Sequence, residues 1–190
     1  MEPNIRYFDD LTAILSAVEA SLWGGEAISL SDGLERTIDI ILKRTGAGRK
    51  VIFIGNGGSA AIASHQAVDY WKNGGLRAIA FNDSSLLTCL SNDYGYPHVF
   101  EKSIEMFSDA GDVLIAISSS GKSENILRGT KAAVEKGCDV ITMSGFKPDN
   151  PLRSRGSVNF YAPSSSYGHV EITHLALCHY LIDTIIGRRA

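Results

Sequence analysis

The spacing of apolar positions changes along the chain. From Ile5 to Trp23 they recur every three or four residues, which predicts one amphipathic helix. A second helix is predicted from a cap at Ser31 or Asp32 to the glycine-containing segment 45–48. Residues 1–48 are therefore predicted to form a pair of helices. We expect their apolar faces to be buried against the rest of the domain and a second subunit.

Residues 49–190 alternate between short apolar runs and amphipathic segments. The predicted strands are 50–54, 77–81, 112–117, 139–144 and 157–161, and the predicted helices are 59–71, 84–91, 97–107, 123–136 and 168–186. Repeated strand–helix units predict an α/β fold with a parallel sheet and helices on both faces. Ligands of such folds bind at the carboxyl ends of the strands.

Two segments rich in glycine and serine follow buried strands at that edge. The first is Gly55-Asn56-Gly57-Gly58-Ser59, and the second is Ser118-Ser119-Ser120-Gly121-Lys122-Ser123. Glycine lets the backbone approach an anion, and serine hydroxyls add donors beside the free N–H groups of the next helix. The first segment is also explained by a simple packing turn. The second favours phosphate binding, because its four serines pack poorly.

Two nucleotide-binding motifs are incomplete. Gly121-Lys122-Ser123 matches the end of the P-loop pattern, but Ala116 occupies the position of its first glycine. The first loop does not give the dinucleotide fingerprint in register with an acidic residue. The phosphate is therefore expected to belong to a small molecule.

Composition narrows the class of protein further. With 190 residues, 44% hydrophobic and 21% charged, the chain is expected to be one globular domain. A net charge of −3 without a long basic run argues against nucleic acid as a partner. We expect no membrane span and no signal peptide, and hence a cytoplasmic protein. The three cysteines, Cys89, Cys138 and Cys178, are widely spaced and are interpreted as packing residues.

Ionisable side chains gather on two predicted helices. His65 and Asp69 share a face of one, and Glu171 and His174 share a face of the last. Glu171 and His179 are separated by roughly 12 Å along the helix axis and about 80° around it. They cannot easily meet at one atom, so we predict an active site at a subunit boundary. Each of these histidines is explained equally well as a core or interface residue.

Together these motifs resemble the SIS (sugar isomerase) domain superfamily and, within it, the phosphoheptose isomerases. The resemblance spans nearly the whole chain, 1–190, and its most specific parts are the two loops, the segment Ser91-Asn92-Asp93-Tyr94-Gly95-Tyr96 and the last helix with His174 and His179. It implies a three-layer, flavodoxin-like sandwich with a five-stranded parallel sheet, and a homotetramer with sites between subunits.

The resemblance also implies roles for individual residues. Sugar contacts would come from Asn56, Gly57, Gly58, Asn92 and Asp93, and phosphate contacts from Ser118, Ser119, Ser120 and Ser123, with Ser59 and Glu171 also at the substrate. One zinc ion per subunit would be held by His65, Asp69, Glu171 and His179. The family's glutamate is Asp69 here, and its glutamine is Glu171.

The implied activity is a ketose–aldose isomerisation of sedoheptulose 7-phosphate through an enediol. Asp69 or Glu171 would abstract the proton, and His179 would donate one or polarise the carbonyl. Two alternatives remain open at this point. The chain could be a non-catalytic phosphosugar-binding regulator of a replication initiator, or an isomerase of another phosphosugar.

Overall fold

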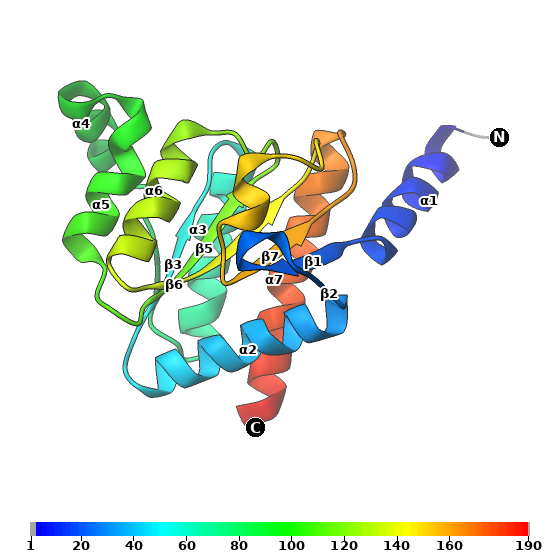
Figure 1. The fold of residues 1–190 in the computed structure, drawn as a ribbon, viewed down its shortest axis with the longest axis horizontal. Helices are drawn as coiled ribbons and strands as arrows, with labels where there is room; N and C mark the ends of the chain where they lie inside the picture. Colours follow the sequence, from blue (N-terminus) through cyan, green and yellow to red (C-terminus); the bar gives the residue numbers. More distant parts are fainter. Residues whose placement is uncertain (1–2, 190) are drawn as a thin grey trace.

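A computed structural model describes residues 3–189 as a central sheet between two helical layers (Figure 1). Its elements are α1 (Pro3–Ser16), β1 (Glu19–Leu22), η1 (Trp23–Gly25), β2 (Ala27–Ile28), α2 (Leu30–Gly46), β3 (Val51–Ile54), α3 (Gly58–Lys72), β4 (Ala78–Ala80), α4 (Ser84–Tyr94), η2 (Tyr96–His98), α5 (Val99–Phe107), β5 (Val113–Ser118), α6 (Glu124–Glu135), β6 (Asp139–Ser144), η3 (Pro151–Ser154), β7 (Val158–Tyr161) and α7 (Tyr167–Arg189). The predicted order of strands and helices after residue 48 is confirmed.

The sheet has seven strands in the order β2-β1-β7-β6-β5-β3-β4. The five strands from β3 to β7 are parallel, as predicted. Successive residues of β3 point to opposite faces, so Val51 and Phe53 enter one core while Ile52 and Ile54 enter the other. Helices α2, α3 and α7 cover the first face, and α4, α5 and α6 cover the second. The fold is the expected three-layer sandwich.

The prediction of one helix from Ile5 to Trp23 is wrong after Ser16. Residues Glu19–Leu22 form β1, which pairs antiparallel with β7, and β2 extends the sheet by one more strand. Burial of Val18 and Ala20 and the ladder to β7 outweigh the helical spacing of the apolar residues. The sheet therefore has two strands more than the five expected.

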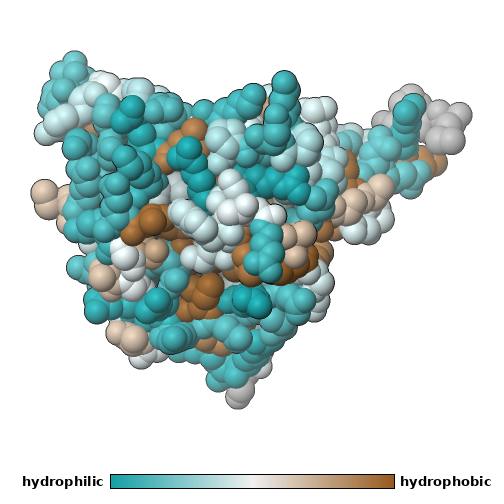
Figure 2. Space-filling view, viewed as in Figure 1, coloured by the Kyte–Doolittle hydropathy of each residue, from teal (hydrophilic) through white to brown (hydrophobic). Residues whose placement is uncertain are grey.

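Helix α1 leaves the body of the molecule and contacts α7 (Figure 1). Its Ile5 and Phe8 side chains are exposed, and Figure 2 shows apolar atoms on α1 and at its junction with the body. Helix α2 begins two or three residues earlier than predicted, because its N-cap is Ser29 in place of Ser31 or Asp32. The Ser29 Oγ accepts a hydrogen bond from the Asp32 N–H. No helix within residues 3–189 has the length and apolar character needed to span a membrane.

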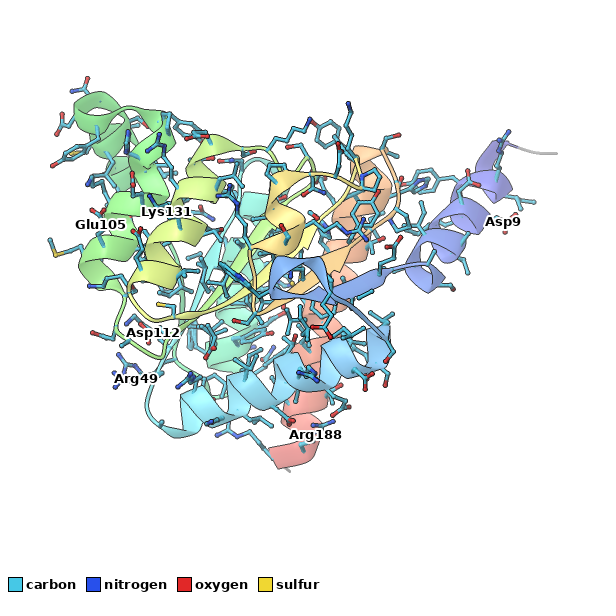
Figure 3. The ribbon with its side chains drawn as sticks, in the orientation of Figure 1. Asp9, Arg49, Glu105, Asp112, Lys131 and Arg188 are labelled. Atoms are coloured by element: carbon cyan, nitrogen blue, oxygen red, sulfur yellow. The ribbon has the colours of Figure 1, made fainter. Side chains whose placement is uncertain are left out.

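A buried carboxylate organises the amino-terminal edge of the sheet. Asp112, labelled in Figure 3, is 1% exposed and lies 2.6 Å from Lys50 Nζ. It also accepts hydrogen bonds from the backbone N–H groups of Lys50 and Asp109. The pairing raises the pKa of Lys50 against the opposing effect of burial. These charges are structural, since they lie at the edge opposite to the candidate site.

Candidate active site

A pocket opens at the carboxyl edge of the sheet, between the loops that follow β3 and β5. Residues from both loops and from the start of α7 line it: Asn56, Gly57, Gly58, Ser59, Ser118, Ser119, Ser120, Ser123, Tyr167 and Glu171. The structure thus brings together both predicted Gly/Ser segments. The lining is made of hydroxyls, amides and one carboxylate, without an arginine or lysine among the described residues.

Glycines shape both loops. Gly57, the N-cap of α3, has φ of 54°, which is the left-handed region that side chains rarely adopt. Gly121 has φ of 63° and packs against the Asn150 amide where a Cβ would overlap Oδ1. Because α3 begins at Gly58, its free N–H groups and the positive end of its dipole face the pocket. Such an arrangement is typical of a phosphate site.

The four serines of the second loop line this pocket. Ser118 Oγ lies 3.4 Å from Ser123 Oγ, and Ser120 Oγ accepts a hydrogen bond from the Lys122 N–H at 3.3 Å. The Ser119 carbonyl accepts from Gly145 N–H, which fixes the loop to the end of β6. Backbone hydrogen bonding therefore holds the serine loop in place.

Asn92 and Asp93, predicted to touch the sugar, lie outside the pocket lining. Both are exposed on α4, where Asn92 Nδ2 donates to Asp93 Oδ1 at 2.9 Å. The same segment reaches the pocket through Tyr96, whose hydroxyl donates to Asn56 Oδ1 at 2.8 Å. The two residues lie on α4 shortly before Tyr96, and their role at the sugar stays a prediction.

A second polar cluster lies on the contact between α3 and α7. Asp69 Oδ2 lies 3.3 Å from His65 Nε2 and 3.8 Å from His179 Nδ1. One ligand atom from each of the three residues lies within 4.8 Å of the others. Two imidazoles and a carboxylate are a donor set that suits zinc, with a fourth position left for another ligand.

Glu171 lies apart from this cluster. Its carboxylate packs on Gly58 at the start of α3, where a Cβ would overlap both carboxylate oxygens. It is therefore a pocket residue in this structure, and within the described residues the metal-ligand geometry is met by the other three predicted ligands alone.

The pocket and the cluster occupy the same pair of helices. His65 follows Gly58 by seven residues on α3, and His179 follows Glu171 by eight on α7. At about 1.5 Å per residue, the cluster lies roughly 10–12 Å further along both helices than the pocket. His65 and His179 are 54% and 40% exposed, so solvent reaches the cluster.

A buried glutamine, Gln66, lies beside the cluster. This side chain is buried, and its Nε2 lies 3.3 Å from His179 Nε2. Its Oε1 is buried without a hydrogen-bond partner. Turning the amide over would let Oε1 accept a hydrogen bond from His179 Nε2–H, leaving the Nδ1 lone pair directed toward Asp69 and a bound ion.

Sequence reasoning did not identify Tyr167 or Asn125. Tyr167 precedes the last predicted helix and lines the pocket, with its ring 4.7 Å from that of Phe146, the one non-glycine residue with positive φ in the described chain. Asn125 pairs with Asn56 through two amide hydrogen bonds. An aromatic residue at the carboxyl edge is a usable sequence signal for Tyr167, whereas the pairing of two distant asparagines is not.

His174 is a core residue in the structure. It is fully buried, and its Nε2–H donates to the Ser144 carbonyl at 3.1 Å while Nδ1 has no partner. Burial lowers its pKa from 6.5 to about 4, despite the opposing hydrogen bond. The ring is therefore neutral at pH 7.

Comparison with known proteins gives a consistent result. Residues 6–145 match the SIS domain family. Phosphoheptose isomerase of Helicobacter hepaticus is 33% identical over 181 residues, covering 92% of each chain, and that of Serratia proteamaculans is 38% identical over 160 residues, covering 81% of this chain and 82% of the other. The structure of phosphoheptose isomerase GmhA from Neisseria gonorrhoeae superposes with a TM-score of 0.83 at 29% identity, covering 95% of this chain and 96% of that one.

Proposed function

The chain belongs to the SIS domain family and, within it, to the phosphoheptose isomerases, and on this premise we propose that it interconverts sedoheptulose 7-phosphate and glycero-manno-heptose 7-phosphate. The reaction is an aldose–ketose isomerisation, an intramolecular oxidation and reduction of neighbouring carbons. We treat residues 1–190 as one domain that carries this activity.

One observation supports the assignment most directly. A pocket suited to phosphate and a cluster of acid, base and metal-ligand groups lie two helical turns apart along the same two helices. A sugar with its phosphate at one end and its carbonyl at the other needs such a separation. Binding of the distant phosphate then positions the reacting carbons, which lowers the entropic part of the barrier.

The anion is held by groups that are neutral overall. Ser118, Ser119, Ser120 and Ser123 offer hydroxyls, and Ser59 and the first N–H groups of α3 supply the dipole end. Gly57, with open space beside it, lets the sugar phosphate approach the backbone, whereas Gly58 makes room for the Glu171 carboxylate. The Glu171 carboxylate repels the phosphate, so we assign it to the sugar hydroxyls or to proton transfer.

The chemical step moves one proton between two carbons. A carboxylate removes the proton from the hydroxyl-bearing carbon beside the carbonyl, and the carbonyl oxygen gains a proton, which gives an enediol. The protonated carboxylic acid then returns its proton to the former carbonyl carbon, while the neighbouring hydroxyl loses its proton and becomes the new carbonyl. Asp69 lies between the two imidazoles and is our first choice as the base, with Glu171 as the second. His179 would protonate or polarise the oxygen on which charge develops.

The residues present fit a zinc ion. His65, Asp69 and His179 would hold it, and Gln66 would fix the tautomer of His179 through its unpaired Oε1. A bound zinc would polarise the sugar carbonyl as a Lewis acid. Glu171 is proposed as the fourth ligand. To reach the ion, its carboxylate would have to move away from Gly58.

We further propose a homotetramer with active sites between subunits. The exposed apolar residues of α1 and the open faces of His65 and His179 support a covering subunit. The cytoplasm is the proposed location, and the three free thiols fit a reducing compartment. The alternatives of a regulator or of a different phosphosugar have less support, because relatives matched over most of their length share the isomerase name.

Incubation of the purified protein with sedoheptulose 7-phosphate, with and without added zinc, tests the assignment. The aldose product should appear in a carbon NMR or chromatographic assay. Asp69→Asn should reduce kcat by about 100-fold or more, since it removes the proposed base. Absence of the aldose under every metal condition would overturn the substrate assignment.

A further inference from the structure

The Asn56 side chain is engaged by protein groups on both of its polar atoms. Asn56 Nδ2 donates to Asn125 Oδ1 at 2.9 Å, and Asn125 Nδ2 donates back to Asn56 Oδ1 at 2.9 Å. The Tyr96 hydroxyl also donates to Asn56 Oδ1, at 2.8 Å. Both acceptor positions of this oxygen are therefore filled, and a ligand could use only the backbone and one amide hydrogen of Asn56.

These three residues come from three separate segments of the site. Asn56 belongs to the loop after β3, and Asn125 lies in the first turn of α6, directly after the serine loop. Tyr96 begins η2, just after the helix that carries Asn92 and Asp93. The reciprocal amide pair thus joins the two phosphate-binding loops, and the tyrosine hydroxyl ties the third segment to them.

Asn125 is the fixed member of the group. Its side chain is 3% exposed, and its Oδ1 also accepts a hydrogen bond from the Ile126 N–H at 3.0 Å. Ile126 is fully buried in the core beneath α6. These bonds fix the orientation of the buried amide, because turning it over would place Nδ2 against the Ile126 N–H and leave that donor unpaired.

Resting on the proposed function, we infer that Asn125 is a positioning residue of the phosphosugar site. It acts through Asn56 and lies outside the pocket lining. Its amide holds the two loops at a fixed separation, so that their N–H and hydroxyl groups converge on one phosphate. Through its hydrogen bond to Asn56, the Tyr96 hydroxyl also fixes the position of the segment that carries Asn92 and Asp93.

Removal of the Tyr96 hydroxyl is the mildest test. Tyr96 is 52% exposed, so Tyr96→Phe should leave the fold intact. We expect KM for sedoheptulose 7-phosphate to rise about threefold with a smaller change in kcat, because a neutral hydrogen bond of modest strength is lost. Tyr94→Phe is the matched control, since Tyr94 is 55% exposed two residues away and makes no side-chain hydrogen bond in the described chain. An equal KM in the two variants would overturn the inference.

Asn125→Ala is the stronger test. It leaves the Asn56 amide without its partner, and KM should rise about tenfold or more. Asn159→Ala is the control, because Asn159 is 1% exposed and bonds the backbone of Ser21 and Leu22, away from the pocket. Both variants should lose thermal stability, whereas only Asn125→Ala should raise KM. A matching rise in the control would mean that Asn125 has only a structural role.

Hydrogen exchange separates this inference from the proposed function, because it needs no substrate. Backbone amides in peptides covering 55–59 and 118–123 should exchange faster in Asn125→Ala and in Tyr96→Phe than in the wild type. Their exchange rates should be unchanged in Tyr94→Phe. If the wild type isomerises no heptose phosphate yet these amides respond, the substrate assignment fails and the positioning role stands. If the amides do not respond in Tyr96→Phe, which keeps the fold, the positioning role is overturned whatever the substrate.

Discussion

The carboxylate of Glu171 packs on the backbone of Gly58, the first residue of α3. This contact joins the start of α7 to the start of α3, and it brings a negative charge to the positive end of a helix. It also explains the second glycine of the Gly57-Gly58 pair in packing terms, since any side chain at Gly58 would displace the carboxylate. The acid is thereby held in the pocket wall.

Gly58→Ala should therefore impair the site without unfolding the protein. The new Cβ overlaps the Glu171 carboxylate, and we expect kcat/KM to fall about tenfold or more. Gly58 does not have a positive φ, and the overlapping atoms are the flexible end of the Glu171 side chain, so the melting temperature should change little. Gly46→Ala, at the end of α2 with open space around it, should change neither rate nor KM. An unaltered kcat/KM for Gly58→Ala would show that the position of Glu171 is unimportant.

Gln66→Leu should weaken zinc binding. The substitution keeps the volume of the side chain but removes the group that orients His179, and loss of such outer partners lowers metal affinity about 10–100-fold. Competition with a chromophoric chelator measures the Kd. Tyr70→Phe serves as the control, because it deletes another buried unpaired polar atom of α3 and should leave the Kd unchanged. Equal affinities in wild type and Gln66→Leu would contradict the assigned role.

Tyr167→Ala should raise KM for the phosphosugar about tenfold, because it removes an aromatic wall of the pocket. Tyr167→Phe should stay within about threefold of the wild type, since the ring keeps its edge contact with Phe146. Steady-state kinetics on both variants gives the comparison, with Tyr94→Ala as an exposed control. A KM unchanged in Tyr167→Ala would remove this residue from the site.

The lowered pKa of the buried His174 should make the stability of the protein depend on pH. The pKa of His174 is lowered to about 4 in the folded protein against 6.5 when unfolded, so the unfolded chain binds more protons between these values. Stability from this group is complete above pH 6.5 and is lost as the pH falls toward 4. Between pH 7.5 and pH 5 the wild type should lose on the order of 2 kcal/mol more unfolding free energy than His174→Gln.

Urea unfolding of both proteins at the two pH values measures this difference. The glutamine variant lacks a titrating group at the buried position, while its amide can still donate to the Ser144 carbonyl. Identical pH slopes for wild type and variant would contradict the buried, neutral state of the ring.

The sequence by itself determined the parallel core and the location of the pocket. Short continuous apolar runs at 51–54 and 113–117 are typical of strands buried on both faces, and the Gly/Ser segments that follow such strands are placed at the carboxyl edge by chain direction. The i, i+4 spacing likewise put His65 and Asp69 on one face. Each of these features depends on residues close together in the chain, so the sequence of one segment was sufficient to predict it.

Only the tertiary structure decided how distant residues combine. Residues 19–22 have helical spacing, yet they form a strand because β7 offers them a ladder and the core accepts Val18 and Ala20. Glu171 joins the pocket while His179 joins His65 and Asp69, since the packing of α7 on α3 fixes which turn of one helix meets which turn of the other. Such long-range pairings depend on burial and hydrogen bonding between segments far apart in the chain, and no spacing within one segment encodes them.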